Sequence, residues 1–212
     1  MKTRVIPASE PEWLEAALAI LREGGVVAFP TDTVYGVGAD PLREDAVEAL
    51  YRAKGRPSEK AIPLLLSDAQ QMEQVVRDVP PAAQALARCF WPGALSMVLP
   101  AREEVPAIVR AGGETLALRM PDHPVALRLI AAFGWPLAVT SANRSGQPSP
   151  ATAEEVLAQL GGRVPLVVDG GRCPGGKPST VLDLTVHPPR ILRPGSVTWE
   201  DVQACLGSLQ SS

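Results

Sequence analysis

The chain has 212 residues, of which 46% are hydrophobic, and it carries a formal net charge of −3. This length suits one elaborated domain with a sizeable core rather than two domains. The acidic balance argues against a protein that holds nucleic acid on a broad basic face. Any cationic site must therefore be local.

Three cysteines and two histidines limit the chemistry further. Cys89, Cys173 and Cys205 include no Cys-x-x-Cys pair, which predicts a reducing compartment, no disulfide framework and a buried structural role for each. His123 and His187 are too few for a His-rich zinc site or a His-Glu-x-x-His helix, and they give little support to a His-based triad. No apolar stretch has the length of a signal peptide or a membrane span, so we expect a cytoplasmic protein without membrane contact.

The first elements are predicted near the N-terminus. Ser9-Glu-Pro-Glu12 has the pattern of a capping box with proline inside the start of a helix. Apolar residues at helical spacing follow over residues 13–21, and Gly24-Gly25 ends the helix. The apolar run 26–29 predicts a strand, and residues 31–38 predict a loop that displays its polar side chains beyond that strand.

A helix is predicted over residues 44–53, and a cationic turn follows it. Four cations lie within nine residues of one another: Arg52, Lys54, Arg56 and Lys60. Only Glu59 can neutralise them, and Gly55 and Pro57 prevent the helix from continuing, so the cations should project from a turn. Such a turn can hold the oxygens of a polyphosphate. The alternative is a solvated charge run that complements the helix dipole.

Strand and helix patterns alternate along the rest of the chain. Strands are predicted over residues 62–66, 95–99, 115–119, 137–140, 166–169, 181–184 and 190–193. Helices are predicted over residues 68–77, 82–90, 125–133, 153–159 and 198–206. The alternation is typical of an α/β protein, and strand pairs without an intervening helix indicate a mixed sheet.

One glycine-rich segment imitates a nucleotide-binding motif. Gly171-Arg-Cys-Pro-Gly-Gly-Lys177 matches a P-loop as far as its lysine. The match then fails, because Pro178 stands where a metal-binding Ser or Thr is needed and a strand pattern follows instead of a helix. We interpret the segment as a flexible loop that can close over a site, or as a surface connection.

Two other places carry polar side chains that suit a ligand. Residues 140–149 follow a strand, in the position where ligands bind in open α/β sheets. Ser141 and Asn143 in this segment could equally satisfy the backbone of a turn. Arg119 ends a strand and could form a bidentate pair with a substrate carboxylate, or with a structural partner such as Asp122.

Seven short segments occur in an order that is typical of one family. They are Phe-Pro-Thr-Asp-Thr-Val-Tyr-Gly-Val-Gly (29–38), Ala-Lys-Gly-Arg-Pro (53–57), Trp-Pro-Gly (91–93), Leu-Arg-Met-Pro (118–121), Thr-Ser-Ala-Asn (140–143), Pro-Ser-Thr-Val (178–181) and Leu-Arg-Pro-Gly (192–195). Through them the chain resembles the YrdC-domain threonylcarbamoyl-adenylate synthases over residues 26–195. It looks like the short, bacterial-type form, without the C-terminal domain of longer members.

The resemblance implies one YrdC-like α/β domain over residues 1–212, with its core at about residues 10–206 and a short Ser-rich tail. A large twisted mixed sheet with flanking helices would surround a concave, positively charged cavity. The implied reaction joins L-threonine, bicarbonate and ATP into threonylcarbamoyl-adenylate and pyrophosphate, for the modification of adenosine beside the tRNA anticodon. The implied partner is a downstream tRNA threonylcarbamoyl transferase, and direct contact with tRNA stays open. Mg²⁺ would arrive with ATP, and neither an organic cofactor nor a protein metal site is implied.

Family roles carry over to the residues that match. The ATP site would comprise Lys54, Arg56, Lys60, Thr115, Ser141, Asn143, Ser149 and Arg193, with Lys54 and Arg56 as catalytic residues. Threonine or its carbamate would be held by Thr33, Arg119 and Ser179. The carbamate itself attacks, so no protein nucleophile is needed and catalysis would depend on positioning and electrostatics. Asp32 is interpreted as a capping or turn residue, or as an outer-shell partner of the metal. One departure is visible, because Ala61 follows Lys60 where relatives often place a proline.

Two alternatives use the same fold. One is an RNA-binding module without adenylate chemistry, and the other is a paralogue with a different acyl acceptor or carbamoyl donor. The ordered set of matching residues favours the synthase, since RNA binding alone would not require it. The acidic net charge also counts against RNA binding.

Overall fold

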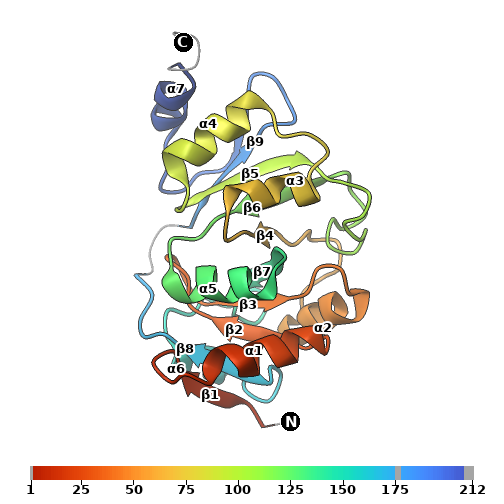
Figure 1. The fold of residues 1–212 in the computed structure, drawn as a ribbon, viewed down its shortest axis with the longest axis vertical. Coiled ribbons are helices and arrows are strands. Elements are labelled where there is room, and N and C mark those ends of the chain that lie inside the picture. Colours follow the sequence, from red (N-terminus) through yellow and green to blue (C-terminus); the bar gives the residue numbers. More distant parts are fainter. Residues whose placement is uncertain (1, 175–177, 208–212) are drawn as a thin grey trace.

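A mixed β-sheet forms the centre of the computed structural model, which describes residues 2–174 and 178–207 (Figure 1). Within those residues the sheet has ten strands in the order β1-β8-β2-β3-β7-β4-β6-β5-β9-β10. The strands are β1 (Arg4–Pro7), β2 (Val27–Phe29), β3 (Gly36–Ala39), β4 (Leu64–Leu65), β5 (Leu95–Pro100), β6 (Thr115–Arg119), β7 (Leu137–Ser141), β8 (Leu166–Asp169), β9 (Thr180–Asp183) and β10 (Arg190–Arg193). Both parallel and antiparallel pairs occur, which confirms the predicted mixed α/β sheet.

Helices pack along this sheet. They are α1 (Trp13–Arg22), α2 (Glu44–Lys54), α3 (Met72–Val75), α4 (Pro81–Phe90), α5 (Pro124–Phe133), α6 (Ala153–Leu160) and α7 (Trp199–Gly207), with a 3₁₀ turn η1 (Ala69–Gln71) before α3. Figure 1 shows α1 near β8, with α5 beside α1 toward the middle of the sheet, and α4 and α7 together at the end of the sheet away from β1. In the described part of the chain, no helix has the length and apolar character needed to cross a bilayer.

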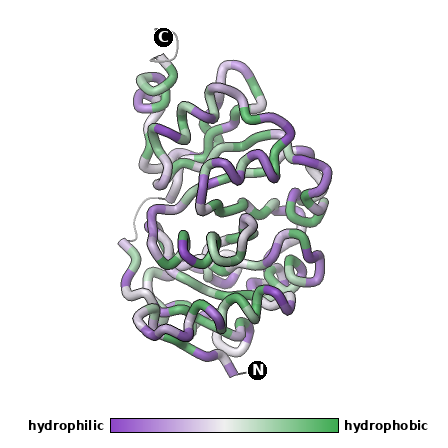
Figure 2. The backbone as a smooth tube through the Cα atoms, in the orientation of Figure 1, coloured by the Kyte–Doolittle hydropathy of each residue, from purple (hydrophilic) through white to green (hydrophobic). Residues whose placement is uncertain are grey.

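The strands bury both faces, and successive side chains of one strand enter different layers. In β2, Val27 and Phe29 pack with α1 and α5, whereas Ala28 joins the larger cluster on the other face. Figure 2 shows hydrophobic residues along the central strands and hydrophilic residues on outer turns. In β6, Leu116 and Leu118 enter the larger cluster, so the residues between them face the opposite way. This alternation aims the end of β6 at the site described below.

The predicted first helix is confirmed, but its predicted capping box was wrong. α1 begins at Trp13, and its N-cap residue Glu12 makes no side-chain capping hydrogen bond. Ser9 lies three residues before that N-cap, too early in the chain to serve as the N-cap itself. A reciprocal capping box does form elsewhere, between Asp68 and Gln71 at the start of η1.

The predicted loop at residues 31–38 was partly wrong. Its second half enters β3, where a Cβ on Gly38 would lie 3.0 Å from the Phe29 ring, so glycine allows the strands to pack closely. Its first half does not display its polar side chains, because Thr31 and Thr33 are buried. Strand β1 was also missed, since its apolar residues are few and it lies at the edge of the sheet.

The prediction of no disulfide was wrong for two of the three cysteines, whereas the predicted burial was wrong only for Cys89. A disulfide joins Cys89 of α4 to Cys205 of α7, which are 116 residues apart in sequence. The packing of α4 against α7 brings them together, and sequence spacing alone gives no sign of it. Cys89 is exposed, whereas Cys173 is free and buried as predicted.

Two predicted segments fall partly on residues that are not described. The glycine-rich loop 171–177 includes residues 175–177, and the Ser-rich tail includes residues 208–212, all of which lie outside the described residues. Strand β8 precedes residues 175–177 in the chain and strand β9 follows them.

Candidate active site

A cavity of about 560 Å³ lies on the face of the sheet toward which β6 aims its last residue. Its polar lining residues are Thr31, Thr33, Arg56, Ser96, Arg119, Thr140, Ser141, Ser149, Ser179 and Arg193. Among the described residues that line it are three arginines and no carboxylate, so we call it the arginine cavity. Its walls come from segments spread over most of the chain.

Lys54 is the last residue of α2, and its ammonium group is turned inward. Gly55 ends the helix with a positive φ of 58°, which is the usual left-handed helix end. Lys54 Nζ donates to the backbone oxygens of Ser141 and Asn143, the latter at 2.6 Å. Only 3% of Lys54 is exposed, so the prediction that all four cations project from the turn was wrong for this one. Burial, followed by the charge of Arg56, lowers the pKa of Lys54 to about 8.

Arg56 and Arg193 line the cavity and are held by neutral oxygens. Arg56 Nη2 donates to the Ala61 carbonyl at 3.0 Å. Arg193 Nη2 donates to the carbonyl of Ser179 at 2.8 Å and to its hydroxyl at 3.0 Å. Across the described ranges neither guanidinium forms a salt bridge. Partial burial of the guanidinium groups lowers the pKa of both, although Arg193 as a residue is exposed and Arg56 is half-buried, and neither has a compensating carboxylate.

Arg119 differs from these two arginines, because a carboxylate holds it. Its Nη2 lies 2.6 Å from both carboxylate oxygens of Asp32, and the side chains are only 9% and 15% exposed. Its Nε donates to the Gly93 carbonyl at 2.9 Å, and its Nη1 to the Thr33 hydroxyl at 3.3 Å. The partner that the sequence suggested, Asp122, is exposed and takes no part. The bidentate face predicted for a substrate carboxylate is therefore occupied by Asp32.

Two pairs of hydroxyl groups complete the floor of the cavity. Ser96 Oγ and Ser179 Oγ are 3.0 Å apart, and both residues are buried. Thr31 Oγ1 and Thr33 Oγ1 are 3.1 Å apart. Ser96 was not predicted as a site residue, although a serine between the core residues of β5 was a signal that could have found it.

The predicted ATP residues do not all reach this cavity. Ser141 and Ser149 line it, and Asn143 is buried beside it, where its side chain holds the turn by donating to the carbonyls of Arg144 and Gln147. Lys54, Lys60 and Thr115 are not among the lining residues: Lys54 is buried behind Ser141, to whose backbone oxygen it donates, whereas Lys60 and Thr115 are exposed. Thr115 begins β6 and Arg119 ends it, so the two side chains lie at opposite ends of that strand.

Comparison with known proteins decides the family. The Sua5/YciO/YrdC family model, described as "Telomere recombination", matches residues 19–195. The chain belongs to this family. The resemblance to YrdC-domain proteins predicted from the seven segments is therefore confirmed.

Individual members of the Sua5/YciO/YrdC family match nearly the whole chain. A protein of Bacillus subtilis named threonylcarbamoyl-AMP synthase is 46% identical over 98% of this chain, which covers 60% of the relative. A protein of Pyrococcus abyssi with the same name is 42% identical over 94% of this chain and 59% of the relative. The structure of P. abyssi Sua5 complexed with L-threonine has a TM-score of 0.91 at 41% identity, and covers 98% of this chain and 61% of that one. The chain thus spans about three fifths of the length of these relatives.

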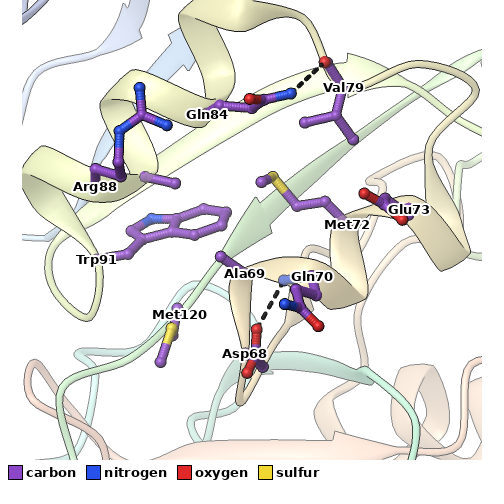
Figure 3. Close-up of a pocket in the computed structure, with 11 residues that line it drawn as sticks. Asp68, Ala69, Gln70, Met72, Glu73, Val79, Gln84, Arg88, Trp91 and Met120 are labelled. Atoms are coloured by element: carbon purple, nitrogen blue, oxygen red, sulfur yellow. Dashed lines mark hydrogen bonds between the residues drawn. The ribbon is translucent and has the colours of Figure 1, made fainter.

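A second cavity of this family member lies between η1–α3 and α4 (Figure 3). It measures about 650 Å³ and is lined by Asp68, Ala69, Gln70, Met72, Glu73, Val79, Gln84, Ala87, Arg88, Trp91 and Met120, and we call it the Trp91 pocket. Figure 3 shows the Trp91 ring in the middle of these residues, with Met72 and Met120 on either side of it. The turn that follows Trp91 joins the two cavities, because the Gly93 carbonyl accepts the hydrogen bond from Arg119.

Proposed function

We propose that the chain is an L-threonylcarbamoyladenylate synthase, a nucleotidyltransferase that makes threonylcarbamoyl-AMP and pyrophosphate from L-threonine, bicarbonate and ATP. One observation carries the proposal: Arg56 and Arg193 line the arginine cavity, Lys54 is bonded to the backbone of the lining residue Ser141, and none of the three has a carboxylate partner in the described residues. Lys54 is a buried cation, which is costly without a counter-charge, and a polyphosphate that meets Arg56 and Arg193 in the cavity would supply that charge. The names of the B. subtilis and P. abyssi relatives support the same reaction.

The phosphate chemistry places clear demands on these cations. The threonine amine first takes up bicarbonate with loss of water, and an oxygen of the resulting carbamate attacks the α-phosphorus of ATP. The bond from that phosphorus to the bridging oxygen breaks, and pyrophosphate leaves with the electron pair. Two anions must approach each other, so Lys54, Arg56 and Arg193 would lower the barrier by offsetting their repulsion and stabilising pyrophosphate.

The part of the cavity around Arg119 suits the amino acid. Arg119 retains one Nη1 hydrogen beyond its bonds to Asp32, Gly93 and Thr33, because Nη2 and Nε are already engaged. That hydrogen and the Thr33 hydroxyl can bind one carboxylate oxygen, and Ser179 can bind the threonine hydroxyl. The bound L-threonine of P. abyssi Sua5 supports an amino-acid site in this fold.

The adenosine part of ATP would extend toward Ser141, Ser149 and the turn that Asn143 holds. Lys60 and Thr115 remain proposed ATP contacts, and they are the two to test first because neither lines the cavity. Substitution of Thr115 by Val should leave the KM for ATP unchanged if the cavity alone holds the nucleotide.

Magnesium is proposed to enter with ATP. Asp32 is bound to Arg119, and the described residues contain no group of three or more His, Cys, Asp or Glu side chains placed to hold a metal ion. The residues thus fit a cation that keeps its water and is held by phosphate oxygens rather than by a protein cage. Bound there, Mg²⁺ would neutralise phosphate charge, and no organic cofactor is proposed.

The product would pass to a tRNA threonylcarbamoyl transferase in the cytoplasm, and direct tRNA contact is part of the proposal to be tested. The decisive experiment measures pyrophosphate release with ATP, Mg²⁺ and bicarbonate, comparing L-threonine with serine, glycine and no amino acid. Release that needs both threonine and bicarbonate would support the synthase. Release with another amino acid would favour a paralogue, and RNA binding without release would favour an RNA-binding module.

A further inference from the structure

The three arginines of the arginine cavity are in two different electrostatic states. Arg119 forms a salt bridge with Asp32 at 2.6 Å, with both side chains largely buried. Arg56 and Arg193 donate to carbonyl or hydroxyl oxygens, and neither forms a salt bridge in the described part of the chain. One cavity thus contains a neutralised guanidinium and two that keep their full charge.

The contacts of Asp32 are arranged so that it acts on the cavity through Arg119. Arg119 and Thr33 line the cavity, whereas Asp32 does not. Asp32 takes the Nη2 group with both of its oxygens, while the Gly93 carbonyl takes Nε. The guanidinium is held from two sides, and its free Nη1 hydrogen is left for a ligand.

We propose that Asp32 is a positioning residue that sorts the ligands of the arginine cavity by charge. It neutralises Arg119 so that this end accepts a zwitterionic amino acid, and it leaves polyphosphate to Arg56 and Arg193. The inference rests on the proposed function, because it assigns the two ends of the cavity to the two substrates.

Asp32 can sort the ligands because charges interact over several ångströms in a cavity that is partly shielded from water. A cation without a counter-charge there attracts the ligand with the most negative charge, and a polyphosphate carries several charges whereas threonine carries none overall. Burial is the main cause that lowers the pKa of Arg119, and the nearby charge of Arg193 contributes in the same direction, so the two guanidinium groups interact. Without Asp32, Arg119 and Arg193 would form one continuous cationic surface, and polyphosphate could occupy both ends.

The geometry also separates this role from two others. Asp32 is not free to bind a metal ion, because both carboxylate oxygens accept hydrogen bonds from Arg119. A salt bridge that only supported the fold would not need Arg119 to line the cavity with one Nη1 hydrogen beyond its bond to Thr33. Charge sorting therefore predicts a change in the coupling between two ligands, which loss of folding stability alone would not produce.

Calorimetry on the full chain tests the proposal with L-threonine and inorganic tripolyphosphate as probes. In the unmodified protein, saturating tripolyphosphate should change the threonine Kd by less than about twofold, since Asp32 offsets the charge of Arg119. In Asp32→Asn, tripolyphosphate should raise the apparent threonine Kd by about tenfold or more, because Arg119 now attracts the anion. Asp32→Glu keeps the charge and should restore independence of the two probes.

A matched control removes the same charge elsewhere. Asp45→Asn breaks the salt bridge between Asp45 and Arg43. This salt bridge is exposed, because the side chain of Arg43 is 41% exposed and that of Asp45 is 63% exposed. The substitution lowers the net negative charge as Asp32→Asn does, so it should leave the two probes independent. Competition in this control would mean that overall charge, not Asp32, governs the effect and would overturn the proposal.

The remaining outcomes decide between the inference and the proposed function. Competition between threonine and tripolyphosphate in the unmodified protein, or in Asp32→Glu, overturns the inference. Both measurements can be made even if Asp32→Asn fails to fold. A folded Asp32→Asn protein without competition also overturns it, while threonine-dependent pyrophosphate release would leave the proposed function intact. Charge sorting without any pyrophosphate release would reject the synthase and keep the inference, whereas absence of threonine binding would reject both.

Discussion

The two cavities have similar volumes, about 560 and 650 Å³, but they differ in the origin and charge of their walls. The Trp91 pocket is built mainly from η1, α3 and α4, which are neighbours in sequence, and its charged side chains are of both signs and exposed. The arginine cavity collects residues from Thr31 to Arg193 and has only positive charges on its walls in the described residues. Volume therefore does not distinguish a functional site here, whereas uncompensated cations do.

The largest expected effect comes from the most buried cation. Lys54→Ala should lower turnover by about 10²–10³-fold, the loss seen when one preorganised charge or donor leaves a reaction site. The measurement is pyrophosphate release at saturating ATP and threonine, with circular dichroism to follow folding. Lys54 is nearly inaccessible and contacts the segment that carries Ser141, so both binding and orientation of phosphate should suffer.

Lys60→Ala is the control for this prediction. Neither lysine lines the cavity, but Lys54 is buried and bonded to the lining residue Ser141, whereas Lys60 is exposed. We therefore expect turnover of Lys60→Ala within about threefold of the unmodified protein. If Lys60→Ala were as damaging as Lys54→Ala, the exposed turn rather than the cavity would hold the phosphates. The contrast between the two cavities would then lose its physical basis.

A second prediction concerns the neutralised end of the arginine cavity. Arg119→Ala should raise the KM for threonine by about 10²-fold and change the KM for ATP much less, because one charge-assisted contact to the carboxylate is lost. It should also destabilise the fold by about 3 kcal/mol, since the largely buried Asp32 is left without its partner. Steady-state kinetics and urea unfolding measure the two effects.

Arg43→Ala provides the matched comparison for stability. It removes an arginine from the exposed salt bridge with Asp45, and we expect little change in the unfolding midpoint. A threonine KM that stays constant in Arg119→Ala would remove Arg119 from the amino-acid site, whatever the stability shows.

Several strands of the sheet could be predicted well from the sequence, among them β6 and β10, which line the arginine cavity. Residues 115–119, 166–169 and 190–193 have the predicted bounds of β6, β8 and β10, because branched and apolar residues bounded by turn residues are a local signal. The α2 helix was also predicted, since its apolar spacing and Gly55 are local as well. The seven short segments, taken in their order along the chain, then indicated the family.

Pairing across the fold could not be predicted in the same way. Asp32 and Arg119 are 87 residues apart in sequence. Asp122 is much nearer to Arg119 in sequence, so a prediction based on neighbouring residues named the wrong partner. Lys54 looked like an exposed residue of a turn, and only the position of β7 and the turn after it shows that its amine is enclosed. Distant contacts of this kind depend on the order of strands in the sheet, which the sequence pattern leaves undetermined.

A third prediction uses the enclosed amine of Lys54 and its pKa of about 8. Above that pH the folded protein loses the charge, whereas the unfolded chain keeps its proton up to about pH 10.4. The unfolded state then binds more protons, so the contribution of Lys54 to stability rises with pH in this window. ATP affinity should move the opposite way and fall by up to about tenfold per pH unit above 8, because the neutral amine no longer attracts phosphate.

Calorimetric titration of ATP between about pH 7 and about pH 9 tests this dependence. Binding at the upper end should be accompanied by proton uptake, since phosphate raises the pKa of the amine again, and the uptake appears as a difference between buffers of unequal ionisation enthalpy. Lys54→Arg stays charged throughout and should show a flatter profile. An ATP affinity that is constant across this range in the unmodified protein would contradict the pKa assigned to Lys54.

The smallest expected effect is in the Trp91 pocket. Arg88→Ala and Glu73→Gln change the charge of exposed side chains on α4 and α3, and both should leave kcat and the two KM values within about twofold of the unmodified protein. The test is sensitive because the turn after Trp91 holds Arg119 through the Gly93 carbonyl. A selective change in the threonine KM would mean that this turn transmits the occupancy or charge of the Trp91 pocket to the amino-acid end of the arginine cavity. The two cavities would then be one coupled system, and the contrast in charge between them would describe two parts of a single site.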